Sequence, residues 1–118
     1  KVAVNFIKNN FIQKGKKMKK ILLCCAAGMS TSLLVNKMKA EAESRGLEVE
    51  IWAEPLDKAS VEVPKADVVL LGPQIKYALP EVKKIADEHG KKIEAINMVD
   101  YGMMNGKKVL DQALALIG

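Results

Sequence analysis

Residues 22–34 read LLCCAAGMSTSLL, and this stretch decides how the chain folds. An apolar run typical of a buried strand ends at two cysteines, and small and hydroxyl residues follow before a helical pattern begins. A strand that passes through such a loop into a helix directs backbone amides and the helix N-terminus toward one point, where an anion can bind. A cysteine at that point has its thiolate favoured and can act as a nucleophile. The pattern therefore predicts capture of a phosphoryl group on Cys25.

The two cysteines have different predicted roles. Cys24 precedes the loop and should point into the sheet, as most free cysteines do when they act as small hydrophobes. A disulfide between neighbouring residues is strained, so both thiols should be free and the compartment reducing. We therefore expect a cytoplasmic protein with Cys25 as its catalytic residue. The expected phosphate-binding loop comprises Ala26, Ala27, Gly28, Met29, Ser30, Thr31 and Ser32.

Strand and helix patterns alternate along the rest of the chain. The expected strands are Ile21–Cys24, Leu47–Ala53, Val68–Leu71 and Ile93–Met98. A helical pattern of apolar residues follows the first strand, with Ser30 or Thr31 as its N-cap. Two further helices are expected to begin at Pro80 and at Asn105 or Gly106. This order predicts an α/β fold, a single doubly wound four-stranded parallel sheet of order 2-1-3-4 with helices on both faces. The second strand alternates apolar residues with Glu48, Glu50 and Trp52, which predicts an edge strand with one solvent-facing side.

The carboxyl ends of these strands should gather the functional residues. In such sheets the site lies beyond the carboxyl ends, beside the first strand. Cys25, Gln74 and Tyr101 all fall at that end of the sheet. Gln74 and Tyr77 are a possible second wall of the pocket or a partner contact, with ordinary helix-surface residues as the open alternative. Tyr101 is a weaker candidate for the same role.

Charge separates the first 17 residues from the remainder. The chain has 19 basic and 14 acidic residues, and the first 17 residues hold five lysines and no acid. In residues 18–118 the basic and acidic residues are therefore equal in number, and both Phe lie outside this range. A protein that binds nucleic acid needs a basic face with aromatic rings for stacking, so this function is not expected. We interpret residues 1–17 as an N-terminal extension, non-native or disordered, with an extra helix or edge strand as the alternative. Residues 18–118 form the single expected domain.

Other kinds of site find little support. His89 is the only histidine and follows two acids at an expected helix end, where a solvated cation is favourable. One histidine and two adjacent cysteines do not have metal-ligand spacing, so no metal and no cofactor is expected. The longest apolar run, Ile21–Met29, is far shorter than the ~18–20 residues that span a bilayer. No direct membrane insertion is expected.

Cys25-Ala-Ala-Gly-Met-Ser-Thr-Ser-Leu-Leu-Val and Ala66-Asp-Val-Val-Leu-Leu-Gly-Pro-Gln-Ile-Lys-Tyr-Ala-Leu-Pro-Glu81 carry a resemblance to a known family. Together with the weaker match at 100–106, they resemble the enzyme IIB component of the lactose/cellobiose (chitobiose) sugar phosphotransferase system, over Met18 to Ile117. The resemblance implies the same doubly wound fold and a monomer that takes phosphate from a phosphohistidine of enzyme IIA onto Cys25. It further implies transfer to a β-linked disaccharide or related glycoside held by the membrane component, enzyme IIC. The protein would then lie transiently at the inner face of the membrane.

The loop after the first strand is also similar to the Cys-x5-Arg loop of low-molecular-weight tyrosine phosphatases. In this chain Thr31 occupies the position at which that class has an arginine that binds phosphate through two hydrogen bonds. No nearby acid is placed to protonate a leaving group, so the sequence argues against a phosphatase. Two alternatives stay open, a cysteine redox or sensor module using Cys25 beside Cys24 and a flavodoxin-like binding domain without chemistry.

Overall fold

A computed structural model describes residues 18–26 and 29–117. The expected extension at 1–17 and the loop residues Ala27 and Gly28 lie outside this part of the chain. Within it, no helix is both long enough and apolar enough to cross a bilayer.

The core of the fold is one sheet of four parallel strands in the order β2-β1-β3-β4. The strands are β1 (Lys19–Cys25), β2 (Val49–Pro55), β3 (Val68–Leu71) and β4 (Lys92–Ala95). All three neighbouring pairs are parallel, with Cys25 of β1 opposite Pro55 of β2 and Cys24 opposite Leu71 of β3. The predicted fold class and strand order are confirmed, and the two central strands are β1, which is apolar from Ile21 onward, and β3, which is apolar throughout.

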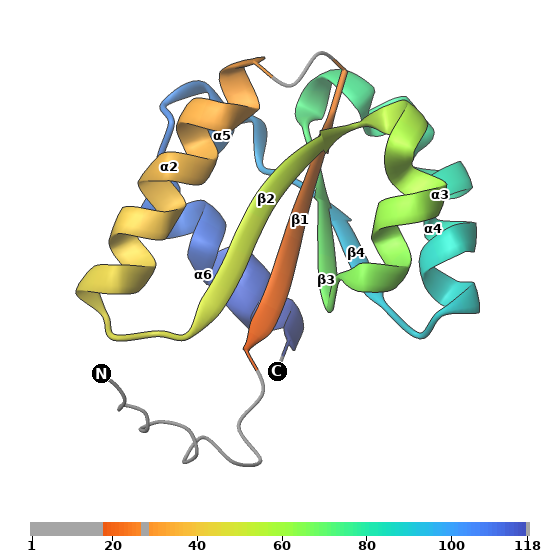
Figure 1. Cartoon of the computed structure of the whole chain (residues 1–118). Coiled ribbons are helices and arrows are strands. Elements are labelled where there is room, and N and C mark those ends of the chain that lie inside the picture. Colours follow the sequence, from red (N-terminus) through yellow and green to blue (C-terminus); the bar gives the residue numbers. More distant parts are fainter. Residues whose placement is uncertain (1–17, 27–28, 118) are drawn as a thin grey trace.

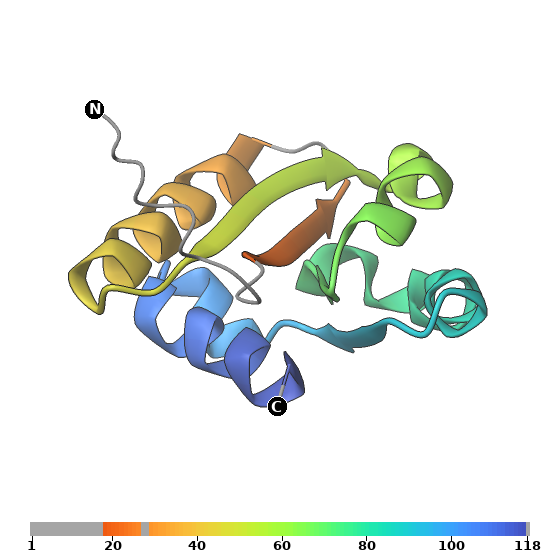
Figure 2. The ribbon, with the colours of Figure 1, turned by 60° about the horizontal axis from the view of Figure 1, so that its bottom comes forward.

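Helices cover both faces of the sheet (Figures 1 and 2). One face carries α2 (Met29–Ser44), α5 (Met98–Gly102) and α6 (Gly106–Ile117). The other carries α3 (Ala59–Glu62) and α4 (Leu79–Glu88), with short 3₁₀ turns η2 (Leu56–Lys58), η3 (Val63–Lys65) and η4 (Pro73–Ala78). The carboxyl ends of the strands, the start of α2 and α5 lie together at the top of Figure 1.

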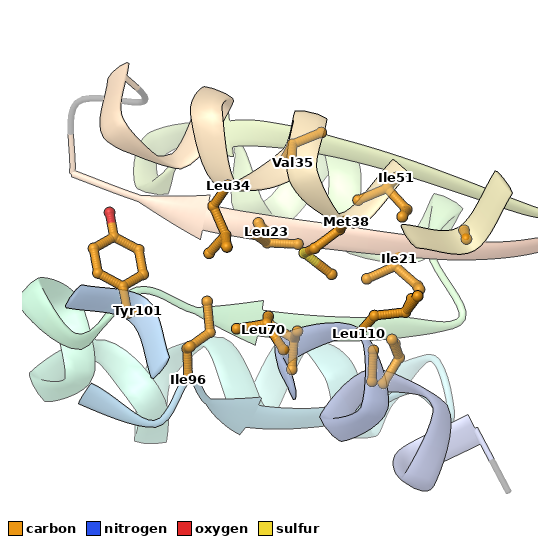
Figure 3. Close-up of a cluster of buried hydrophobic side chains, with 14 residues drawn as sticks. Ile21, Leu23, Leu34, Val35, Met38, Ile51, Leu70, Ile96, Tyr101 and Leu110 are labelled. Carbon is orange, nitrogen blue, oxygen red and sulfur yellow. The ribbon is translucent and has the colours of Figure 1, made fainter. Parts of the chain in front are cut away.

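Strand alternation divides the core into two clusters. Ile21 and Leu23 of β1 face α2 and α6, and Figure 3 shows them packed with Leu34, Met38 and Leu110. Leu22 and Cys24 face the opposite way, toward α3 and α4. Because successive side chains of a strand point to opposite faces, adjacent residues of β1 serve different layers. This alternation fixes the two cysteines in different surroundings.

Several element boundaries differ from those predicted. α2 begins at Met29, so Ser30 and Thr31 lie inside the helix and neither is its N-cap. β4 ends at Ala95, and Met98, predicted as the end of a strand, instead begins α5. Asn105 does cap the last helix, since its Oδ1 accepts from the Lys108 amide at 3.1 Å.

The second strand is less open to solvent than predicted. Trp52 is half-buried, and its Nε1 donates to Glu62 Oε1 at 3.1 Å. The 3₁₀ turns and short helix between Leu56 and Lys65 bring Glu62 over this side of β2. The expectation of a solvent-facing side holds only for Glu48 and Glu50, which are exposed.

Candidate functional site

Cys25 is the last residue of β1 and marks the centre of the candidate site. Its side chain is buried, with a residue exposure of 3%, and its thiol donates weakly to the Glu54 carbonyl oxygen at 3.9 Å. The 16-residue helix α2 begins four positions later, at Met29. The free amides and partial positive charge of a helix N-terminus favour an anion in its first turn. The start of α2 therefore offers these groups to an anion at this end of the sheet.

The end of β3 lies directly against Cys25. The Gly72 amide donates to the Cys24 carbonyl oxygen at 2.9 Å. A Cβ placed on Gly72 would lie 3.9 Å from Cys25 Cβ and 2.9 Å from Gln74 Oε1. The first distance is ordinary van der Waals contact, and the second involves the end of a flexible side chain, so both show how close the two strand ends and the Gln74 amide lie. The structure thus places the Gln74 amide and Cys25 on either side of Gly72, and the role of Gln74 as a pocket wall or partner contact stays a prediction.

Thr31 connects the first turn of α2 to α5. Thr31 is 1% exposed, Tyr101 is 7% exposed, and Thr31 Oγ1 lies 3.1 Å from Tyr101 Oη, a hydrogen bond in which either group can donate. Figure 3 shows the Tyr101 ring at the margin of the core cluster with its hydroxyl pointing away from the apolar side chains. Tyr101 is therefore part of the core and a support for the helix that follows the loop. This buried pair was not predicted, because Thr31 and Tyr101 are 70 residues apart.

Replacing Tyr101 with phenylalanine should lower the free energy of unfolding by about 1 kcal/mol, because it removes a buried hydrogen bond and keeps the ring. Tyr77→Phe is the matched control, since Tyr77 is 77% exposed and should change stability by less than ~0.5 kcal/mol. Urea unfolding of both variants measures the difference. Equal losses in the two variants would contradict the structural role of the Thr31–Tyr101 bond.

Tyr77 occupies a different part of the site from Tyr101. Its ring projects from η4 into solvent and lines a groove of about 560 Å³ with Ala26, Pro55 and Glu81. The groove runs from the residue after Cys25 to the first turns of α4. The structure thus places Gln74 near the candidate nucleophile, Tyr77 on a groove that reaches Ala26, and Tyr101 against Thr31 at the start of α2.

Cys24 is placed where a reactive thiol is disfavoured. Its side chain is fully buried, with 0% exposure, on the α3 and α4 face. Burial, followed by the nearby Cys25, Glu54 and Glu62, raises the pKa of Cys24 from 9.0 to about 12. A thiol that keeps its proton is a weak nucleophile. These surroundings fit the predicted role of Cys24 as a core residue.

The raised pKa of Cys24 predicts a pH-dependent stability. Between pH 9 and about 12 the unfolded thiol loses its proton while the folded one retains it, so the free energy of unfolding falls as the pH rises. Cys24→Ala removes this contribution. The stability advantage of the wild type over Cys24→Ala should therefore be largest near pH 8 and shrink toward pH 10.5, as measured by urea unfolding of both proteins. A difference that is constant with pH would contradict this.

The structure describes only some of the other residues that the sequence singled out. Ser32 is exposed, whereas Ala27 and Gly28 and the side chains of Met29 and Ser30 lie outside what the structure describes. His89 is exposed at the end of α4, and its Nδ1 lies 3.0 Å from the Ile85 carbonyl oxygen.

Asn97 begins a helix at the site end of the sheet, a role that was not predicted. Its Oδ1 accepts from the amides of Val99 and Asp100 and so caps α5. An asparagine followed three residues later by an acid is a recognised signal for a helix start, and this signal was available in the sequence.

Comparisons with known proteins identify the family. Residues 20–112 match the family model described as "PTS system, Lactose/Cellobiose specific IIB subunit". The oligo-beta-mannoside-specific EIIB component of Bacillus subtilis is 54% identical over 100 residues, covering 85% of this chain and 97% of the relative. The cellobiose-specific EIIB component of Lactococcus lactis is 49% identical, covering 80% and 93%.

A solved structure agrees with these sequence matches. The cellobiose-specific IIB component of Borrelia burgdorferi, determined in solution, superposes with a TM-score of 0.73 at 41% identity. The match covers 87% of this chain and 94% of that protein. The resemblance drawn from the residues is confirmed, and this chain belongs to the lactose/cellobiose family of IIB subunits of the sugar phosphotransferase system (PTS).

Proposed function

We propose that this chain carries a phosphoryl group on Cys25 between two partners of the sugar phosphotransferase system. The donor is a phosphohistidine on the soluble component EIIA, and the acceptor is a sugar bound by the membrane component EIIC. The placement of Cys25 at the end of β1, four residues before the N-terminus of α2, is the observation that supports this most directly. An EIIB subunit acts in sugar uptake, and one relative, from Lacticaseibacillus casei, is a fused EIICB protein.

The chemistry consists of two displacements at phosphorus. In the first, the Cys25 thiolate forms the S–P bond while the N–P bond of the phosphohistidine breaks, and the departing imidazole nitrogen takes up a proton. In the second, a sugar hydroxyl oxygen forms the O–P bond while the S–P bond breaks. Cys25 leaves as a thiolate, and the hydroxyl proton passes to solvent. Positioning and charge stabilisation supply most of the catalysis in phosphoryl transfer, which suits a loop of amides at a helix N-terminus.

The acceptor sugar is proposed from the family and its relatives. Members of this family are named for lactose and cellobiose, and the matched relatives for oligo-β-mannosides, cellobiose and galactose. We propose a β-linked disaccharide such as cellobiose, chitobiose or lactose. The chain would act as a monomer in the cytoplasm and reach the membrane only transiently, through EIIC.

The relay can be tested by reconstitution. The chain is incubated with phosphoenolpyruvate, the general phosphotransferase proteins and a lactose-family EIIA, and peptides are then analysed by mass spectrometry. One added phosphoryl group on Cys25 is expected. An unmodified Cys25 under conditions that phosphorylate a cellobiose-specific EIIB would reject the carrier. Oxidation of Cys25 by peroxide in the same unmodified protein would favour the redox alternative.

A phosphoryl carrier of this kind should not hydrolyse aryl phosphates as a phosphatase does. Thr31 stands at the position of the phosphatase arginine and is buried against Tyr101, so no guanidinium grips the phosphoryl oxygens from this position. We expect negligible turnover of p-nitrophenyl phosphate, measured by nitrophenolate release. Steady hydrolysis that disappears in Cys25→Ser would place the chain among the phosphatases instead.

A further inference from the structure

Backbone hydrogen bonds hold the strand ends together at the candidate site. The Gly72 amide donates to the Cys24 carbonyl oxygen at 2.9 Å and joins the end of β3 to the end of β1. The Ile96 amide donates to the Leu71 carbonyl oxygen at 2.8 Å and joins the segment after β4 to β3. The end of β1 and the segment that leads into α5 are therefore parts of one hydrogen-bonded framework.

The Thr31–Tyr101 bond joins the start of α2 to this framework. Tyr101 lies in α5, which begins two residues after Ile96, and Thr31 is the third residue of α2. Cys25 is the last residue of β1 and is paired with Pro55 in the sheet. The chain from Cys25 to Thr31, which carries the proposed phosphate-binding loop, is thus held by the sheet at one end and by Tyr101 at the other.

The short helix α5 is a fixed base for the Tyr101 side chain. At its start, Asn97 Oδ1 accepts from the Asp100 amide at 3.1 Å. At its end, the Asn105 amide donates to the Asp100 carbonyl oxygen at 2.8 Å and the Met104 amide to the Tyr101 carbonyl oxygen at 3.0 Å, which is the bonding of a Schellman motif. Because hydrogen bonds close both ends of α5, the position of Tyr101 does not depend on α2.

A buried pair of hydroxyl groups contributes direction rather than much stability. Thr31 and Tyr101 are 1% and 7% exposed, and apolar side chains of the same shape could fill their places at little cost in free energy. Apolar contacts have no preferred direction, whereas a hydrogen bond fixes both a distance and an angle. The bond therefore sets the orientation of the first turn of α2, whose amides have no partners within the helix.

We infer that Tyr101 is a positioning residue for phosphoryl transfer through Cys25. It holds Thr31, and with it the first turn of α2, so that the free amides of this turn face the phosphoryl group. The inference rests on the proposed function and extends it to a buried residue that does not touch the phosphoryl group. A group misplaced by 1 Å can lower the rate of a reaction about 10²-fold, so a single hydrogen bond can matter at this place.

Phosphorylation of the full chain by phosphorylated EIIA tests the inference. Single-turnover rates at increasing EIIA concentrations give a maximal rate and a half-saturating concentration. Tyr101→Phe should lower the maximal rate about tenfold or more. The half-saturating concentration should not change, because the ring is 7% exposed and offers little surface to a partner. Thr31→Val should be as slow as Tyr101→Phe, and Thr31→Ser, which keeps the hydroxyl, should retain most of the rate.

The double variant Thr31→Val/Tyr101→Phe separates positioning from stability. It removes both hydroxyls of the pair and leaves neither without the other, so it should be no less stable than either single variant. Its maximal rate should nevertheless stay as low as theirs. Trp52→Phe is the matched control, because it removes the Trp52–Glu62 hydrogen bond on the other face of the sheet. This control should lose stability and keep the wild-type rate.

Four results would overturn the inference. A wild-type maximal rate in Tyr101→Phe, or a rate regained in the double variant, would leave the bond with a structural role alone. A change confined to the half-saturating concentration would make Tyr101 a partner contact, and a Thr31→Ser variant as slow as Thr31→Val would exclude the hydroxyl. Rates are compared below the lowest melting temperature of the set. A wild-type chain that EIIA does not phosphorylate would instead contradict the proposed function, so the two failures are distinguishable.

Discussion

Cys25→Ser should abolish phosphoryl transfer while the fold stays intact. A serine hydroxyl in place of the thiol is not ionised near neutral pH, so the helix N-terminus and loop have no anionic nucleophile to present. Loss of a nucleophile typically lowers turnover by about 10³-fold or more. The measurement is phosphorylation by EIIA and sugar phosphate formation in membranes that contain EIIC. Retention of the wild-type melting temperature would show that the loss is chemical.

Cys24 provides the control one residue away. Cys24→Val fills a fully buried position on the α3 and α4 face and should retain most of the activity, as should Cys24→Ser. Some loss of stability is expected from either change, because the site is tightly packed. Equal loss of transfer in the Cys24 and Cys25 variants would show that the nucleophile has been assigned to the wrong cysteine.

The fold could be predicted because its signals are local and repeated. The apolar runs of β1 and β3 are short and lack alternation, which is typical of central parallel strands. Between them, charged residues at alternate positions marked β2 as an edge, and helical spacing recurred after each strand. With right-handed crossovers, few topologies remain, and the order with β1 and β3 at the centre is the one observed.

The errors arose where tertiary contacts decide the local structure. Trp52 shares one side of the strand with Glu48 and Glu50 and was predicted to be exposed, yet η2, α3 and η3 fold over it and supply Glu62. Met98 looked like a strand residue, yet Asn97 caps a helix there. A bond such as that of Thr31 to Tyr101 joins distant segments, and no spacing rule for a single element could reveal it. The groove that Tyr77 lines likewise depends on segments that meet only after the sheet has formed.

The largest effect on stability is expected at Gly106, the first residue of α6. A Cβ built there would lie 2.7, 2.8 and 2.9 Å from the carbonyl carbon, Cβ and carbonyl oxygen of Lys37 in α2. Two of these three atoms belong to the backbone of a neighbouring helix and cannot rotate away, so α2 and α6 would have to separate. Gly106→Ala should therefore lower the free energy of unfolding by about 1–3 kcal/mol.

Gly102→Ala is the matched control for this change. Gly102 lies in α5, close in sequence, and a Cβ there would have no heavy atom within 4 Å. Alanine in place of an unconstrained helical glycine should leave stability unchanged or raise it by up to ~1 kcal/mol. Each kcal/mol corresponds to a shift of roughly 4–8 °C in melting temperature for a domain of this size class, so calorimetry separates the two variants clearly.

The consequence of Gly106→Ala should extend to the site. Thr31 lies in the first turn of α2, and Tyr101 lies in α5, which ends shortly before α6 begins. A displacement of α2 from α6 therefore strains the Thr31–Tyr101 bond that joins α2 to α5. The helix N-terminus behind Cys25 would lose its fixed position, and phosphorylation of Cys25 should slow at temperatures well below the melting point. If Gly106→Ala matches Gly102→Ala in both stability and phosphorylation rate, the close approach of the two helices does not hold the site in place.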